Sequence, residues 1–155
     1  QQGQAALRAW VDWDQGQVGG YAPRDGVYYT PHTTVGGILR KHTGKEPFDA
    51  PQALREAAAK RTASRCADPR IGDVPVCFLA NGDTTGGNSG SPVIDGRGRL
   101  VGLNFDRVFE GVAGDYGWSP DRSCNVCVDI RYVLWHLEAV MKAPQLLAEM
   151  GVEPR

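Results

Sequence analysis

The sequence predicts a mostly β domain with one helical insert and a C-terminal helix. Segments rich in Val, Tyr, Phe and Leu alternate with turns rich in Gly, Pro and Asp, a pattern typical of short strands. Two stretches, 48–64 and 130–150, instead have the Ala, Leu, Glu and Lys content that favours helices. The 155 residues, 41% hydrophobic and 23% charged, are enough for one globular domain with one core.

The N-terminal elements follow from breakers and caps. Residues 6–41 are expected to form strands and turns, because their Val, Tyr and Trp residues are interrupted by Gly-Gly pairs and by the turn sequence PRDG. Residues 48–64 predict the first helix of the chain. Asp49 can cap its N-terminus, and Pro51 suits its first turn.

The C-terminal half predicts a strand, a Gly-rich loop, a hairpin and a final helix. Residues 73–81 form the strand that enters the loop, and residues 91–95 and 100–105 flank the turn sequence GRGR as a hairpin. A last strand is expected to lead into a helix at about 130–150. Pro144 should bend or restart this helix, and a glycine should close it.

Composition argues against several classes of partner. The net charge of −1 is unlike that of a general nucleic-acid binder. No apolar run approaches the roughly 18 residues that a membrane-spanning helix needs. The chain also opens without a basic segment followed by an apolar one, so no export signal is visible. We therefore expect no nucleic-acid or membrane partner.

Four cysteines raise the question of a metal site or a disulfide: Cys66, Cys77, Cys124 and Cys127. The CxxC pair lies in a β-branched segment, where residues three apart on a strand point to opposite faces and can neither bond each other nor share a metal. The other two are not at zinc-site spacing, and no histidine completes a site. We expect no metal and no cofactor, and the sequence leaves a disulfide and buried free thiols both open.

The segment GGNSGSP, residues 86–92, is typical of a serine nucleophile loop. Acyl transfer needs an exposed hydroxyl and backbone N–H groups that converge on the developing oxyanion, and glycine permits the backbone angles that expose them. Ser89 is the expected nucleophile, and the N–H groups of Gly87 and Ser89 are expected to form the oxyanion hole. The alternative interpretation is an ordinary Ser/Gly turn. The exact sequence GNSGSP followed by a β-hairpin favours the nucleophile loop over this alternative.

These residues also resemble a known family. GGNSGSP resembles the Gly-Asp-Ser-Gly-Gly-Pro loop of chymotrypsin-fold proteases, with Asn88 in place of the Asp. Residues 21–39, 81–107 and 128–150 together resemble the C-terminal part of the bacterial dipeptidyl peptidase 7 and 11 family, serine exopeptidases that release dipeptides from free peptide N-termini. The resemblance covers the chain from about residue 18 to 150.

The resemblance implies that residues 1–155 are the second β-barrel of a chymotrypsin-like (trypsin-like) peptidase domain, with a helical insert and a C-terminal helix. It implies a fragment of a longer protein whose N-terminal barrel and inserted helical domain are missing here. Peptides with a free N-terminus would be its substrates, and the parent protein would be periplasmic or secreted and free of metal. It leaves a homodimer of the parent open.

The catalytic triad is incomplete in this chain. In the chymotrypsin order a catalytic His precedes the Ser, and only His32 and His42 do so. Neither His32 nor His42 has the family's sequence context for the catalytic histidine, and His42 lies in a polar loop and is expected on the surface. The third histidine, His136, follows the serine on an apolar helix and is expected to be structural. The simplest account is that the His and Asp partners lie outside this chain, so that the fragment alone is inactive.

Arg107 ends the hairpin strand that, by position, borders the pocket for the P1 side chain. A guanidinium can hold a carboxylate through two hydrogen bonds. By resemblance, dipeptidyl peptidase 11 carries Arg at this position and cleaves after Asp or Glu, whereas dipeptidyl peptidase 7 has Gly. Arg107 is then expected to be unpaired when the substrate is apolar. Phe105 and Asp106 are further candidates for substrate binding, although Asp106 can equally pair with a neighbouring cation.

Two other functions compete with an acid-specific dipeptidyl peptidase. Glutamyl endopeptidases use a similar serine loop but lack a segment like residues 128–150. A non-catalytic peptide-binding pseudo-protease would explain the incomplete triad but not the intact loop around Ser89. Most of the residues that bind the substrate amine are expected outside the chain, and by resemblance Asp106 is a candidate for the P1 pocket or for the amine-binding network.

Overall fold

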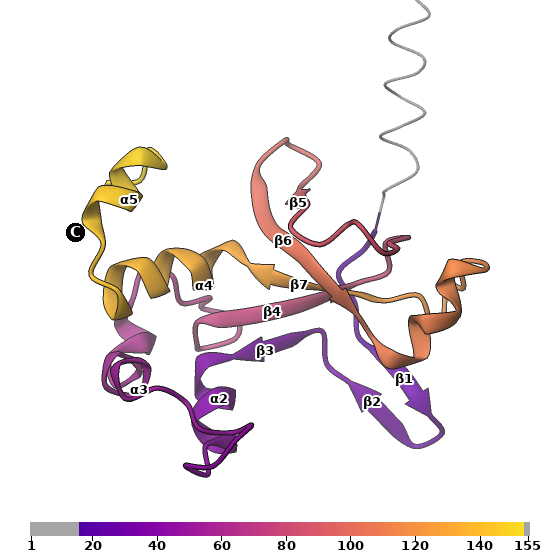
Figure 1. The fold of residues 1–155 in the computed structure, drawn as a ribbon, viewed down its shortest axis with the longest axis horizontal. Helices are drawn as coiled ribbons and strands as arrows, with labels where there is room; N and C mark the ends of the chain where they lie inside the picture. Colours follow the sequence, from indigo (N-terminus) through magenta and orange to yellow (C-terminus); the bar gives the residue numbers. More distant parts are fainter. Residues whose placement is uncertain (1–15, 154–155) are drawn as a thin grey trace, which may run out of the picture. The chain divides into compact units, whose positions relative to one another are not determined.

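The computed structural model describes residues 16–153. Within them, strands form two sheets and helices connect and follow the strands (Figure 1). The small sheet pairs β1 (Tyr21–Arg24) with β2 (Val27–Tyr29). The larger sheet has the order β3-β4-β7-β6-β5, with the bounds His32–Thr34, Pro75–Ala80, Asn125–Asp129, Leu100–Arg107 and Pro92–Ile94 in that order. The mostly β framework with helices is as predicted.

The described chain divides into two compact units, and the first contains residues 16–32, 78–93 and 103–127. Its β1–β2 hairpin is antiparallel and turns at Asp25-Gly26, where Gly26 has a φ of 72° that glycine adopts without strain. Tyr21 on β1 donates a hydrogen bond of 2.8 Å to the carboxylate of Glu110. Glu110 belongs to η2 (Phe109–Asp115), a 3-10 segment that follows β6.

The second unit contains residues 33–77, 94–102 and 128–153 and has an apolar core. Helices α2 (Val35–Lys41) and α3 (Gln52–Ala58) contribute Val35, Leu54 and Ala58 to this core, where Trp135 and Val74 are also buried. A short 3-10 turn, η1 (Arg61–Ala63), follows α3. Burial of these side chains stabilises the unit by removing apolar surface from water.

The C-terminal helix is broken as predicted. It consists of α4 (Ile130–Trp135), a π-helical turn η3 (His136–Val140) and α5 (Pro144–Glu149). Pro144 begins α5, where its missing N–H costs nothing. Gly151 follows with a φ of 70°, typical of a residue that closes a helix.

Two local predictions were wrong. The segment that includes Gly36 and Gly37 forms α2 instead of strand and turn, because the Thr34 side chain accepts a 3.1 Å hydrogen bond from the N–H of Gly37 and buried Asp73 accepts one of 3.0 Å from Gly36. Asp49 does not cap α3, whose N-cap is Pro51 with no side-chain hydrogen bond. The part of the first predicted strand segment at residues 6–15 lies outside the described residues.

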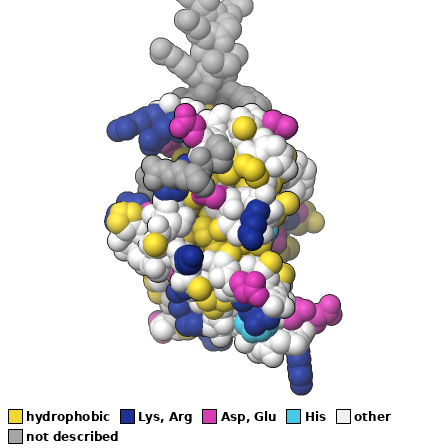
Figure 2. Space-filling model, turned by 90° about the vertical axis from the view of Figure 1, so that its left-hand side faces the viewer, with side chains coloured by type: hydrophobic (Ala, Val, Ile, Leu, Met, Phe, Trp, Pro, Cys, Tyr) yellow, Lys and Arg dark blue, Asp and Glu magenta, His cyan; other side chains and the backbone are white. Residues whose placement is uncertain are grey.

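The surface carries mixed charge. On the face shown in Figure 2, Lys and Arg are interspersed with Asp and Glu around apolar atoms, and no extended area of one sign is visible there. Among the described residues, the helices are all too short or too polar to cross a bilayer.

Candidate active site

Ser89 lies between β4 and β5, in the first unit. The residue is exposed, so its hydroxyl can be reached from solvent. The hydroxyl donates a hydrogen bond of 3.3 Å to the carbonyl oxygen of Phe105 on β6. This contact places the predicted nucleophile beside the strand that ends at Arg107.

The loop presents alternate backbone N–H groups. The N–H of Asn88 bonds to the carbonyl of Thr85 at 3.2 Å, and the N–H of Gly90 bonds to the carbonyl of Asn104 at 2.7 Å. Within residues 16–153, the N–H groups of Gly87 and Ser89 donate to no protein acceptor. These are the two groups predicted to form the oxyanion hole, and an unsatisfied exposed pair is free to bind a developing oxyanion.

Glycine is required on both sides of the nucleophile. Gly87 has a φ of 102° and Gly90 a φ of 87°, both in the region that side chains disfavour. An added Cβ would meet nothing within 4 Å at either position. The requirement therefore comes from the backbone conformation and not from a crowded neighbour.

A buried amide network supports this loop. Asn104 on β6 is 6% exposed, and its Nδ2 donates to the carbonyl of Asn88 at 3.3 Å. Asn104 also bonds through its backbone N–H to the carbonyl of Ser91 at 2.9 Å. The Oδ1 of Asn104 accepts a hydrogen bond of 2.9 Å from the Nδ2 of Asn125, a residue that is 5% exposed. Asn125 in turn accepts from the N–H of Gly82 at 3.3 Å, at the start of the loop.

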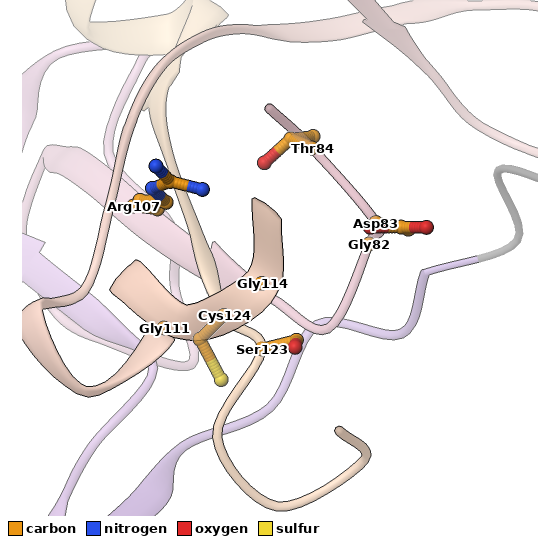
Figure 3. A pocket seen from close by; sticks show the side chains of 8 residues that line it. All are labelled: Gly82, Asp83, Thr84, Arg107, Gly111, Gly114, Ser123 and Cys124. Atoms are coloured by element: carbon orange, nitrogen blue, oxygen red, sulfur yellow. The ribbon is translucent and has the colours of Figure 1, made fainter. Parts of the chain in front are cut away.

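The pocket that contains Arg107 lies in the same unit (Figure 3). Its empty space of about 200 Å³ includes space that is open to solvent. In Figure 3 the side-chain oxygen of Thr84 and the guanidinium of Arg107 are directed toward one another, whereas the carboxylate of Asp83 points away. The remaining wall residues are Gly82, Gly111, Gly114, Ser123 and Cys124.

Arg107 is already paired, which corrects the prediction that it lacks a partner in the absence of an acidic substrate. Its Nη1 and Nη2 donate to Oδ1 and Oδ2 of Asp115 at 2.8 Å each. The guanidinium lowers the pKa of the Asp115 carboxyl, so this carboxyl is ionised at neutral pH.

The two residues before Arg107 contact the site through defined atoms. Phe105 contributes its carbonyl to the hydroxyl of Ser89, while its side chain is 46% exposed and thus outside the core. Asp106 is exposed, and its carboxylate accepts a hydrogen bond of 2.8 Å from the backbone N–H of Arg107. The roles of Gly87, Phe105, Asp106 and Arg107 in substrate binding or catalysis stay predictions.

The histidines have structural contacts. His42 was predicted to lie on the surface, but it is half-buried. Its Nδ1 accepts a hydrogen bond of 3.0 Å from the N–H of Ala50, which closes the loop before α3. His136 packs its ring against Tyr132 at a centroid separation of 5.6 Å, and its Nδ1 is buried. Both lie in the second unit, and His32 begins β3.

Within residues 16–153, all four cysteines are thiols and none is joined in a disulfide, so the structure shows the thiols, one of the two alternatives that the sequence left open. Burial raises the pKa of Cys66, Cys77 and Cys124, which makes these thiols poor nucleophiles. Among the residues that the structure describes, no cluster of three His, Cys, Asp or Glu side chains could hold a metal ion.

Comparison with known proteins assigns the family. The family model described as peptidase S46 matches residues 14–152. The chain belongs to the peptidase S46 family. An S46 relative from Capnocytophaga gingivalis, named Asp/Glu-specific dipeptidyl-peptidase, is 47% identical over 136 residues, which cover 87% of this chain and 19% of the relative. A protein from Phocaeicola vulgatus named dipeptidyl-peptidase 7 is 41% identical and covers 88% of this chain and 19% of its own length.

A solved S46 structure has a similar fold. The crystal structure of DPP11 from Porphyromonas endodontalis in complex with the dipeptide Arg-Asp superposes with a TM-score of 0.83 at 36% identity, over 90% of this chain and 20% of that one. The chain thus spans about a fifth of the length of the relatives that it matches.

Sequence reasoning missed Asn104, Asn125 and Asp115. Asn104 carries a weak signal, since it is an amide within a predicted strand of otherwise apolar or small residues, and Asn125 is an amide between the two cysteines of the CxxC pair. Asp115 carries none, because its pairing with Arg107 depends on the path of η2.

Proposed function

We propose that this chain supplies the nucleophile, the oxyanion hole and the P1 pocket of a serine dipeptidyl peptidase that releases N-terminal dipeptides with Asp or Glu at P1. The observation that carries the proposal is the exposed Ser89, whose own N–H and that of Gly87 donate to no protein acceptor within residues 16–153. Its hydroxyl is hydrogen-bonded to the strand that ends at Arg107. Relatives whose names state Asp/Glu-specific dipeptidyl-peptidase activity support the acidic preference.

In this mechanism the Ser89 hydroxyl attacks the carbonyl carbon of the P1 residue and gives up its proton to a base. The tetrahedral intermediate carries its negative charge toward the N–H groups of Gly87 and Ser89. Loss of one such donor costs about 10²- to 10³-fold in kcat in serine proteases, so the loop geometry contributes strongly to the rate. Arg107 binds the substrate carboxylate in the pocket, with Thr84 beside it.

The base and its Asp partner are proposed to lie outside these 155 residues. His42 and His136 are held by contacts in the second unit, and His32 lies in a strand without the family's catalytic context. In this proposal residues 1–155 are the second barrel of a chymotrypsin-like domain. A first barrel and a helical domain complete a periplasmic or secreted enzyme.

The test uses the complete gene product that contains this chain, assayed on dipeptidyl reporters ending in Asp, Glu, Leu and Phe. Ser89→Ala should abolish turnover and retain substrate binding, because only the hydroxyl is removed. Ser91→Ala, two residues away in the same loop, is the matched control and should keep most activity. Turnover at the wild-type rate in Ser89→Ala would contradict the mechanism.

Arg107→Gly tests the acidic preference separately. It should lower kcat/KM for the Asp and Glu reporters by roughly ten- to hundredfold or more and spare the Leu and Phe reporters, because it removes the guanidinium that binds only the acidic side chains. An unchanged order of preference would show that Arg107 lies outside the P1 site. The 155-residue chain alone should be inactive, and robust hydrolysis by it would locate the base within the chain.

A further inference from the structure

The pair between Arg107 and Asp115 uses the part of the guanidinium that a carboxylate ligand prefers. Both terminal nitrogens of Arg107 are engaged, each at 2.8 Å from a different oxygen of Asp115. This is the two-bond geometry in which Arg binds carboxylates generally. A substrate carboxylate would seek the same two donors, so Asp115 occupies the position that the proposed function gives to the substrate.

The two partners differ in how firmly they are held. The Arg107 side chain is 25% exposed and lies in the pocket wall, whereas the Asp115 side chain is 47% exposed. Within residues 16–153, the Asp115 carboxylate has no hydrogen-bond donor other than Arg107. Asp115 is the last residue of η2, and the residue after it, Tyr116, is 97% exposed. Release of Asp115 into solvent would therefore break one pair and uncover no core.

Charge opposes simultaneous binding of both carboxylates. Asp115 already places one carboxylate on the guanidinium, and the Asp106 carboxylate accepts a hydrogen bond of 2.8 Å from the backbone N–H of Arg107. A substrate carboxylate added beside a retained Asp115 would place a further negative charge around one guanidinium, which like-charge repulsion disfavours.

We propose that Asp115 is a specificity-determining residue that holds Arg107 in the free enzyme and is displaced by the acidic side chain of the substrate. This inference rests on the proposed function, because it assumes that Arg107 binds the P1 carboxylate. Asp115 weakens the binding of acidic substrates, which must replace it. It also lets apolar side chains enter, since Arg107 stays neutralised when they bind. Asp115 thus reduces the discrimination between acidic and apolar P1 residues.

The experiment compares Asp115→Asn, Asp115→Ala and Asp115→Glu in the complete gene product. For the Asp115→Asn and Asp115→Ala proteins, KM for the Asp and Glu reporters should fall by about three- to tenfold with kcat retained, because no internal carboxylate competes. Their kcat/KM for the Leu reporter should fall, because Arg107 then meets an apolar group without a partner. Asp115→Glu keeps the carboxylate and should stay closer than the other two variants to the wild-type ratio of kcat/KM between the acidic and the Leu reporters.

Asp95→Asn is the matched control. Asp95 also pairs with an arginine, Arg99, at 2.8 Å, but on the β5–β6 turn. This variant should leave all kinetic constants unchanged. Thermal unfolding of every variant checks the fold, and calorimetric binding of the dipeptide Ala-Asp to the Ser89→Ala form gives a second reading of affinity that does not depend on turnover.

The outcomes separate this inference from the proposed function. Asp115→Asn could instead lower kcat/KM for the acidic reporters as Arg107→Gly does, and weaken the binding of Ala-Asp. That result would mean that Asp115 holds Arg107 in place for the substrate, and the proposal that the substrate displaces Asp115 would be wrong. Unchanged KM and unchanged Ala-Asp binding would also overturn it. If Arg107→Gly itself leaves the acidic preference intact, the proposed function fails instead.

Discussion

Replacement of Asn104 by Leu should destabilise the protein through the amide network beneath the serine loop. The change removes the hydrogen bond to the Asn88 carbonyl and the one from Asn125. Each is worth about 0.5–1.5 kcal/mol, and the amide left behind costs about 1–3 kcal/mol when it is buried without a good partner. The Nδ2 of Asn125 then keeps only a contact of 3.1 Å to the Sγ of Cys127, while its Oδ1 still accepts the hydrogen bond from the N–H of Gly82. We expect a total loss of about 2–4 kcal/mol.

A double-mutant cycle gives the sharper test. Removal of both amides, in Asn104→Leu with Asn125→Leu, leaves no unsatisfied side chain in the network, so the combined loss should be smaller than the sum of the single losses by about 1–2 kcal/mol. The free energy of unfolding is measured by urea denaturation followed by tryptophan fluorescence. Additive losses would refute the reasoning, because they would show that the two amides do not depend on each other.

Asn88→Ala is the control for this cycle. The Asn88 side chain accepts a hydrogen bond of 2.8 Å from the N–H of Thr85 at an exposed position, where a water molecule can replace the side chain as acceptor. Its loss should cost less than about 1 kcal/mol. An Asn104→Leu effect no larger than this would mean that the network contributes little to stability.

Three further predictions concern the second unit and the thiols. Asp68→Asn should lower the free energy of unfolding by about 2 kcal/mol at pH 7, because Arg70 and Arg131 lower the pKa of Asp68 in the folded state. The stability that the ionised Asp68 provides is present above about pH 4 and is lost on acidification, so the urea curves of variant and wild type should converge at low pH. Gly36→Ala should destabilise by about 1–3 kcal/mol in the same assay, because its Cβ would collide with the Asp73 carboxylate, whereas Gly37→Ala has ordinary contacts and should be neutral or stabilising. A thiol reagent should titrate four cysteines in denaturant without reductant, and the native protein should react slowly.

The elements that sequence could predict are those fixed by local chemistry. The serine loop and the β5–β6 hairpin follow from residues within a few positions of one another, such as Gly87 and Gly90, whose positive φ values the loop requires. Pro144 and Gly151 likewise mark the final helix by their own backbone preferences. Such signals do not depend on what packs against the segment.

The errors have tertiary causes. The Gly-Gly pair of α2 has low helix propensity, and the helix forms there because Asp73, distant in sequence, accepts the N–H of Gly36 while Val35 is fully buried. The contact between Asn104 and Asn125 joins two strands that are neighbours only in the folded sheet. No pattern within either segment could reveal it.

The pairing of Arg107 changes the physical basis of the expected acid preference. An unpaired arginine would reject apolar side chains through the cost of leaving a buried charge unsatisfied. In this structure the charge is satisfied by Asp115, so that cost is absent when an apolar side chain enters. On the proposed mechanism, preference is the difference between the affinities of two carboxylates for one guanidinium. A half-exposed internal carboxylate loses that competition only if the substrate is held in place by its other contacts. On the proposed mechanism, contacts of the substrate backbone with the complete protein would therefore contribute to the acidic preference.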